Sequence, residues 1–207
     1  MLQSLKTLVI DTSTPYLFLA LYDQRELVDS HYQKGHNDHS VTLMDTLQEM
    51  LSSQGWKPAF LDEIIVGIGP GSYTGLRIGV VVAKMLAWSL SCRLYTVSSL
   101  ALLASSVLED GQVLAWMDAR RDHAFLEMYE KTRHTLIPVD QPRYSDFKAY
   151  QNSVKNPFVL VSSGHPNMNV IWASDLAVLV TDVHQVEPFY LRDTEAERQL
   201  KDRVNNS

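Results

Sequence analysis

The first third of the chain alternates short apolar runs with turn signals. This pattern predicts three consecutive strands joined by tight hairpins, at residues 5–10, 16–22 and 26–32. The period then changes, because apolar side chains in residues 39–53 recur at helical spacing and Gly55 follows the last of them. A strand, a helix, a strand and a helix follow, at residues 64–67, 73–90, 94–97 and 98–108. Strands that give way to alternating helices and strands predict an α/β fold.

The pattern of the opening strands returns near the middle of the chain. Two apolar strands end on Asp11 and Asp118, which stand 107 positions apart, and each returns through Phe-Leu to a tyrosine followed by an acid. Any two β-hairpins can look alike, but the repeat also fits an internal duplication. Weaker patterns beyond it predict a short helix and two strands, at residues 145–151, 157–162 and 176–180. We therefore expect two lobes, residues 1–110 and 111–192, and a polar tail, residues 193–207.

Composition indicates a folded chain with an acidic balance. Hydrophobic residues make up 45% of the 207, and the formal net charge is −6, which disfavours tight nucleic-acid binding by this chain alone. The lone Cys92 excludes an intrachain disulfide. Residues 76–90 form the longest apolar stretch, but it is too short to span a bilayer and is interrupted by Arg77 and Lys84. The start of the chain lacks the pattern of a signal peptide, so we expect a cytoplasmic protein.

A glycine-rich string, Gly-Ile-Gly-Pro-Gly-Ser-Tyr-Thr-Gly-Leu-Arg-Ile-Gly, occupies residues 67–79. It is not a P-loop, because no Lys-Ser or Lys-Thr follows the glycines. It is not a dinucleotide fingerprint either, because Pro70 falls inside it. Two interpretations stay open: an anion site built from backbone amides, or a strand-to-helix turn whose Gly75 and Gly79 allow close helix packing. We favour the second.

Five strings together resemble the TsaB family in their order and spacing. They are Val-Ile-Asp-Thr-Ser-Thr near the start, the glycine-rich string, Val-Ser-Ser-Leu at 97–100, Met-Asp-Ala-Arg-Arg at 117–121 and Pro-Phe-Tyr-Leu-Arg at 188–192. The resemblance implies the actin-like fold of sugar kinases, Hsp70 and actin, with two ribonuclease-H-like lobes of which the second is reduced. It also implies a non-catalytic, activating subunit of the machinery that forms threonylcarbamoyladenosine on transfer RNA.

The same resemblance implies the partners. TsaD, the catalytic paralogue, would form a heterodimer with this chain, the ATPase TsaE would be a third subunit, and the synthase TsaC would act upstream. The isolated chain would pair with itself, and tRNA would be reached only through the complex, with no membrane partner. No intrinsic cofactor is expected, and ATP or ADP would bind within the complex.

Two positions depart from the catalytic paralogue. Its His-x-x-x-His metal pair is matched here by Ser99 and Leu103, which do not coordinate a metal as that pair does. We therefore expect no metal and no catalytic residue, which also argues against a metallopeptidase. An active ATP-dependent small-molecule kinase of the same fold is the alternative. The segment before Pro188 is also shorter than the family pattern, so the second lobe is expected to be trimmed.

A weak nucleotide or phosphate site is the second candidate feature. Its residues are the first Asp-Thr-Ser turn and part of the glycine-rich string: Asp11, Thr12, Ser13, Gly71 and Ser72. The alternative, which we favour, is that these polar side chains satisfy the backbone groups of a turn. Arg120-Arg121 is either a surface pair or an anion clamp.

The histidine-rich stretch that precedes the first long helix invites a zinc interpretation. His31, His36 and His39 lie there with Asp38. They fit a loop that closes into a helix cap better than a metal site.

Two helices, residues 39–53 and 73–90, carry more apolar positions than one buried stripe needs. We expect these positions to form a four-helix contact with a partner: Val41, Met44, Leu47, Leu51, Ile78, Val81, Met85 and Trp88. The alternative is that both helices are buried within the chain.

Overall fold

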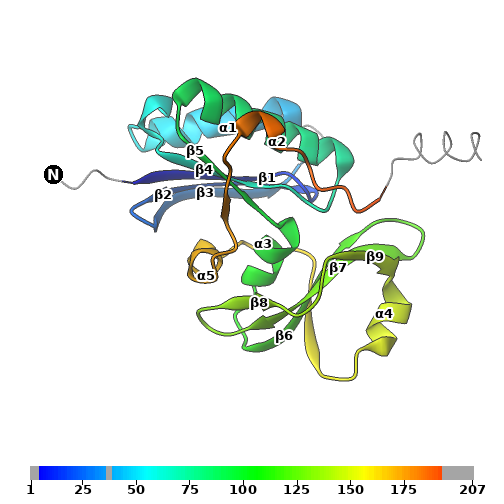
Figure 1. Cartoon of the computed structure of the whole chain (residues 1–207). Coiled ribbons are helices and arrows are strands. Elements are labelled where there is room, and N and C mark those ends of the chain that lie inside the picture. The colour runs from blue at the N-terminus through cyan, green and yellow to red at the C-terminus, as the bar shows by residue number, and fades with distance from the viewer. Residues whose placement is uncertain (1–4, 36–38, 193–207) are drawn as a thin grey trace, which may run out of the picture.

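The computed structural model describes residues 5–35 and 39–192, with the side chains of residues 39–41 left out. His36, Asp38, the side chains of His39 and Val41, and the tail at 193–207 therefore lie outside the described part of the chain. Within it, the elements form two lobes, each built on one β-sheet (Figure 1).

The first sheet has six strands in the order β11-β5-β4-β1-β2-β3. These strands are β1 (Lys6–Asp11), β2 (Tyr16–Asp23), β3 (Glu26–Lys34), β4 (Glu63–Gly67), β5 (Arg93–Val97) and β11 (Val178–Leu179). The first three are antiparallel neighbours, whereas β4 and β5 extend the sheet as parallel strands, each preceded by a helix. The helices are α1 (His39–Ser53) and α2 (Tyr73–Leu90). The predicted order of strands and helices in this half is confirmed.

The second lobe begins with the same arrangement of strands as the first lobe, on a smaller scale. Its main strands are β6 (Gly111–Asp118), β7 (His123–Lys131), β8 (Leu136–Pro138), β9 (Arg143–Asp146) and β10 (Phe158–Val161). The β6–β7 hairpin is antiparallel and β10 joins β6 in parallel, as β1, β2 and β4 do in the first lobe. This shared topology agrees with the internal duplication. The short strands β8 and β9 were not predicted, because they gain stability only by pairing with β7.

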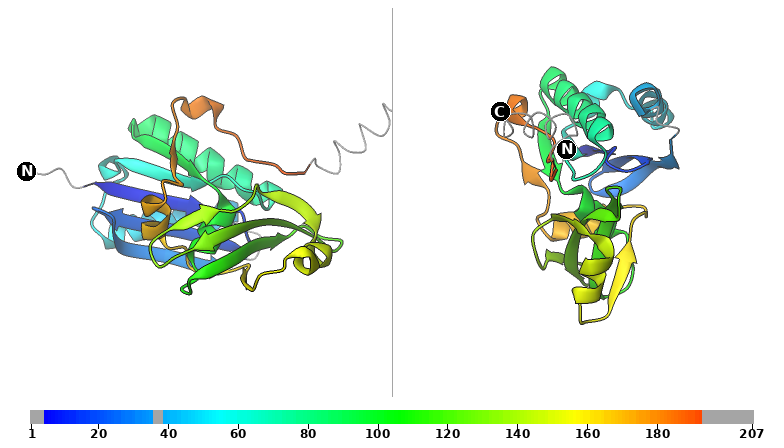
Figure 2. Two further views of the ribbon diagram at one scale, coloured as in Figure 1. Left: turned by 60° about the horizontal axis from the view of Figure 1, so that its bottom comes forward. Right: turned by 90° about the vertical axis from the view of Figure 1, so that its right-hand side faces the viewer.

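Helices and sheets alternate in layers across the molecule (Figures 1 and 2). The helices α1 and α2 cover the outer face of the first sheet and enclose one apolar core. Two shorter helices, α3 (Ser99–Ser105) and α5 (Met168–Ala173), share a second core with the inner faces of both sheets. The helix α4 (Phe147–Ser153) covers the outer face of the second sheet and a third, smaller core. The middle core is continuous between the lobes, so burial holds them together.

The end of the described chain corrects one predicted boundary. We assigned residues 111–192 to the second lobe, but β11 pairs with the edge strand β5 of the first sheet. The segment that follows lies against α2, where the Lys84 ammonium donates to the backbone carbonyl of Val186 at 2.8 Å. An edge strand presents unpaired backbone groups, and β11 satisfies part of that edge. The chain thus returns to the first lobe after α5.

The glycines of the 67–79 string allow a close approach between α2 and the β1–β2 turn. A Cβ atom at Gly75 would overlap the backbone carbonyl of Thr12, and one at Gly79 would overlap the Thr12 hydroxyl. That hydroxyl donates to the carbonyl of Gly75 at 2.7 Å. The packing interpretation of these glycines is therefore confirmed.

Glu127 is a buried carboxyl in the middle core, and it should make stability depend on pH. Burial raises its pKa from 4.5 to about 7, against the opposing effect of the Tyr129 hydroxyl, which donates to it at 2.5 Å. Between these two pH values the folded chain holds a proton that the unfolded chain has lost. The free energy of unfolding should therefore fall as pH rises through this window, by up to about 3 kcal/mol.

Glu127→Gln should remove that part of the pH dependence and raise stability at pH 8, because the amide stays neutral. Urea denaturation at several pH values measures the effect. Glu130→Gln is the matched control, since Glu130 is exposed on the same strand. Parallel pH profiles for Glu127→Gln and the unsubstituted chain would contradict the prediction.

Candidate functional site

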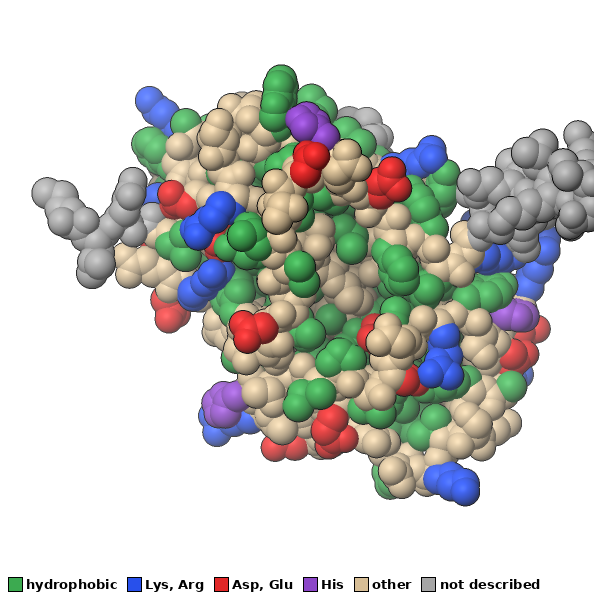
Figure 3. All heavy atoms as spheres, in the orientation of Figure 1, with side chains coloured by type: hydrophobic (Ala, Val, Ile, Leu, Met, Phe, Trp, Pro, Cys, Tyr) green, Lys and Arg blue, Asp and Glu red, His purple; other side chains and the backbone are tan. Residues whose placement is uncertain are grey.

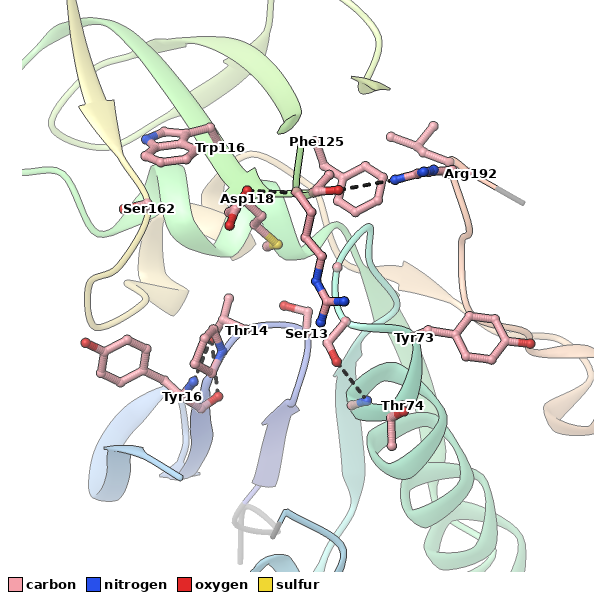
Figure 4. Close-up of a pocket in the computed structure, with 18 of the residues that line it drawn as sticks. Ser13, Thr14, Tyr16, Tyr73, Thr74, Trp116, Asp118, Phe125, Ser162 and Arg192 are labelled. Atoms are coloured by element: carbon pink, nitrogen blue, oxygen red, sulfur yellow. Dashed lines mark hydrogen bonds between the residues drawn. The ribbon is translucent and has the colours of Figure 1, made fainter. Parts of the chain in front are cut away.

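A cleft of about 1060 Å³ lies between the two lobes. The first lobe contributes the β1–β2 turn and the start of α2, and the second lobe contributes the β6–β7 turn and the residues after β10. Figure 4 shows Ser13, Thr14 and Tyr16 on one side, with Trp116, Asp118 and Ser162 facing them from the other. The cleft is thus built by parts of the chain that are distant in sequence.

The first-lobe wall contains three of the five predicted phosphate residues: Ser13, Gly71 and Ser72. The other two, Asp11 and Thr12, are buried and do not line the cleft, and their assignment stays a prediction. One carboxylate oxygen of Asp11 accepts the Ser13 backbone N–H at 2.6 Å, and Thr12 bonds to Gly75. These two side chains hold the turn in place, as the alternative interpretation proposed.

The second-lobe wall is the β6–β7 turn. Arg120, Arg121 and Asp122 all adopt positive φ angles, between 55° and 66°, which non-glycine residues rarely do. The turn is closed by the Asp118 carboxylate, which accepts the Arg120 backbone N–H at 2.8 Å. Both arginines line the cleft. Both are also exposed to solvent.

The Pro-Phe-Tyr-Leu-Arg segment bridges the lobes at one end of the cleft. The backbone N–H of Phe189 donates to the carbonyl of Ile68 at 2.7 Å, and the Tyr190 ring stacks on Tyr73 of α2. Arg192 reaches the second lobe and donates to the Ala119 carbonyl at 3.2 Å (Figure 4). This role was not predicted, since the motif carries no local signal for a contact more than seventy residues away.

The two positions that match the metal pair of the catalytic paralogue are occupied by structural side chains. The Ser99 hydroxyl accepts the Gly69 backbone N–H at 3.0 Å, and Leu103 is buried in the middle core. Among the described residues, no group of three or more His, Cys, Asp or Glu side chains lies close enough to hold a metal ion.

The residues predicted to form the partner surface on α1 and α2 fall into an exposed group and a buried group. Met44, Val81, Met85 and Trp88 are 46%, 52%, 64% and 67% exposed. Leu47 and Leu51 instead face the first sheet and are buried, so their assignment to the partner surface is corrected. Ile78 is half-buried against the same core. Hydrophobic side chains are visible at the top of the molecule in Figure 3, over these helices.

No helix in the described ranges is both long enough and apolar enough to cross a membrane.

Comparisons with known proteins agree on one family. The family model described as TsaD, tRNA N6-adenosine threonylcarbamoyltransferase, matches residues 31–157. The tRNA threonylcarbamoyladenosine biosynthesis protein TsaB of Bacillus subtilis (strain 168) is 32% identical over 218 residues, which covers 92% of this chain and 95% of that protein. The protein of the same name from Escherichia coli (strain K12) is 28% identical over 135 residues, or 64% of this chain and 58% of that one.

A solved structure described as YeaZ from Pseudomonas aeruginosa superposes with a TM-score of 0.76 at 24% identity. The match covers 90% of this chain and all of that one. At this identity the match shows the shared fold.

Proposed function

The chain belongs to the TsaB family, and from that premise we propose that it is a non-catalytic scaffold that binds and activates TsaD. Its place in the biosynthesis of threonylcarbamoyladenosine on tRNA follows from the relatives. In the proposed complex TsaD performs the chemistry, TsaE is the third subunit, and any ATP or ADP is bound within the assembly. Contact with tRNA is made through the complex, in the cytoplasm. The fold is the actin-like one.

The observation that carries this proposal is the apolar stripe on α2. Val81, Met85 and Trp88 follow one another at spacings of four and three, so they lie on one face of the helix. All three are exposed, and Met44 adds a fourth exposed apolar side chain from α1. Large apolar side chains grouped on a surface mark a contact with another protein, and Met and Trp are favoured there.

The proposal of TsaD as the partner is supported by the match to the TsaD family model. It spans residues 31–157, which include both α1 and α2. TsaD is therefore expected to present a related pair of helices on its own first lobe. Two related helix pairs can meet about a pseudo-twofold axis, as identical surfaces do in a symmetric dimer. The same geometry allows two copies of this chain to pair when TsaD is absent.

The surroundings of Ser99 and Leu103 support a role without chemistry. A metal-dependent site there would need nitrogen or oxygen ligands pointing into a cavity. Ser99 already accepts a backbone hydrogen bond, and Leu103 packs in the core. Replacing these side chains by histidine would disturb packing that the two lobes share.

Reconstitution with purified components tests the proposal. The chain should co-purify with TsaD in a stoichiometric complex, and tRNA modification by TsaD should require it. The chain alone should show no ATP turnover and no peptidase activity. ATP-dependent phosphorylation of a small molecule by the isolated chain would instead support the kinase alternative, and modification that proceeds equally without the chain would contradict the scaffold proposal.

A further inference from the structure

We propose that a small pocket at the start of β4 binds a small neutral primary amide. In this site the Glu63 carboxylate accepts a hydrogen bond from the amide nitrogen, and the Trp172 indole N–H donates to the amide carbonyl. The pocket is separate from the cleft between the lobes, because β4 begins at Glu63 and the chain reaches that cleft only after β4 ends, at Gly71. The site also does not depend on the partner surface of α1 and α2.

The walls of the pocket come from three parts of the first lobe and its neighbourhood. Its volume is about 170 Å³. The strands β4 and β5 form one wall, the β2–β3 turn forms a second, and the end of α5 with the residues after it forms the third. The residues that the argument uses are Glu63, Ile65 and Tyr95 from the strands, Arg25 from the turn, and Trp172 and Asp175 from the α5 region.

Glu63 provides a buried acceptor with one oxygen left open. The residue is 0% exposed. Its Oε1 accepts from the Thr7 hydroxyl at 2.8 Å and from the Arg25 guanidinium at 2.6 Å. Its Oε2 lies 3.4 Å from Arg93 Nη2 as an ion pair, but it accepts no hydrogen bond from any described residue. A buried carboxylate oxygen normally accepts at least one hydrogen bond, so Oε2 is suited to a donor from a ligand.

Trp172 provides a buried donor in the same pocket. Its Nε1 atom is buried and has no hydrogen-bond partner among the described residues. The ring is held from two sides, since the Arg25 guanidinium lies 4.2 Å from its centroid and the Tyr22 ring packs against it edge to face at 4.9 Å. An indole N–H can only donate, so its partner must be an acceptor. The pocket therefore asks for a ligand that carries a donor and an acceptor together.

The charges around the pocket favour a neutral ligand. Arg25 and Arg93 are paired with Glu63, and Asp175 lies in the lining. These four side chains are two cations and two acids, so their formal charges balance. A charged ligand of either sign would add an unbalanced charge at a partly buried site, which is costly. A primary amide carries N–H donors beside a carbonyl acceptor and has no net charge.

The size of the pocket limits the ligand to a few heavy atoms. A volume of about 170 Å³ corresponds to roughly five or six water molecules at about 30 Å³ each. It is smaller than the sites that hold drug-sized ligands. Ile65 and the Tyr95 ring supply apolar surface for a short alkyl group. Acetamide and propionamide are therefore the probes.

Proton–nitrogen NMR on the full chain tests the site directly. The chain has four tryptophans and hence four indole N–H signals, and the one that disappears in Trp172→Phe belongs to Trp172. Acetamide and propionamide should move this signal saturably, with dissociation constants on the order of 10 mM. Acetate and methylammonium should not, because each is charged, and N,N-dimethylacetamide should not, because it lacks the N–H donor. No saturable shift with either primary amide, or equal shifts with acetate or N,N-dimethylacetamide, would overturn the proposal.

Trp172→Phe tests the assigned donor, since phenylalanine keeps an aromatic ring and removes only the indole N–H with part of the ring system. Acetamide binding, followed at the backbone amide of Ala177 in the pocket lining, should weaken by roughly fivefold or more. Trp56→Phe is the matched control, because the Lys6 ammonium lies over the Trp56 ring at 4.1 Å but Trp56 does not line the pocket. It should leave binding unchanged. Unchanged binding by Trp172→Phe, or equal weakening by Trp56→Phe, would contradict the assigned site.

Discussion

Replacing Trp88 by glutamate is expected to abolish binding to TsaD while leaving the chain folded. Trp88 is the most exposed side chain of the α2 stripe, so the monomer loses little packing when it is changed. In the complex, the carboxylate of the new glutamate would be buried among apolar side chains. Burying a charge in this way costs several kcal/mol unless the charge is paired. A loss of 4 kcal/mol corresponds to roughly a thousandfold weaker complex. Size-exclusion chromatography and calorimetry with purified TsaD measure it.

Leu108→Glu is the matched control for this prediction. Leu108 is also a strongly exposed apolar residue, but it follows α3 and lies outside the α1–α2 face. It should bind TsaD as well as the unsubstituted chain does. Met85→Glu should behave like Trp88→Glu, because the two side chains share the stripe. If both Trp88→Glu and Met85→Glu form the complex normally, the exposed apolar side chains of α2 are not the TsaD interface.

Gly75→Ala is expected to destabilise the protein strongly. Alanine favours a helix over glycine by about 1 kcal/mol, so helix propensity alone predicts a more stable chain. The added Cβ, however, would overlap the backbone carbonyl of Thr12, which no rotamer change can move. Separating α2 from the β1–β2 turn should cost more than about 4 kcal/mol, a large part of the stability of a typical domain. Urea denaturation followed by circular dichroism measures the loss.

Gly79→Ala tests whether a clash with Thr12 causes the loss of stability. Its Cβ would overlap the hydroxyl of Thr12, which is a side-chain atom, and otherwise lies 3.5 Å from the Thr12 Cβ. Thr12→Ala removes that hydroxyl together with its bond to Gly75. The double variant Gly79→Ala with Thr12→Ala should therefore be more stable than the sum of the two single changes predicts. Thr12→Ala should give no such recovery in Gly75→Ala, and equal recovery in both would contradict the assigned contacts.

The sequence determined the elements whose signal is local. Apolar runs bounded by turn signals predicted β1, β2 and β3, and helical spacing predicted α1 and α2, because these signals lie within each segment. The glycine-rich string predicted a turn into a closely packed helix, since only a residue without Cβ fits there. The repeated strand–Asp–turn–strand unit predicted a second lobe that starts like the first. The resemblance to the TsaB family was also readable from short strings, and the comparisons agree with it.

Only the tertiary structure decided which of the candidate residues can meet a ligand or a partner. Leu47 and Met44 have the same helical period, yet one faces the sheet and the other is exposed, because the orientation of α1 is set by packing. Asp11 is withdrawn into its own turn, whereas Ser13, two residues later, lines the cleft. Arg120 and Arg121 line the same cleft as the start of α2 only because the continuous middle core fixes one lobe against the other. Local patterns carry no information on such contacts, which depend on pairings between segments far apart in the chain.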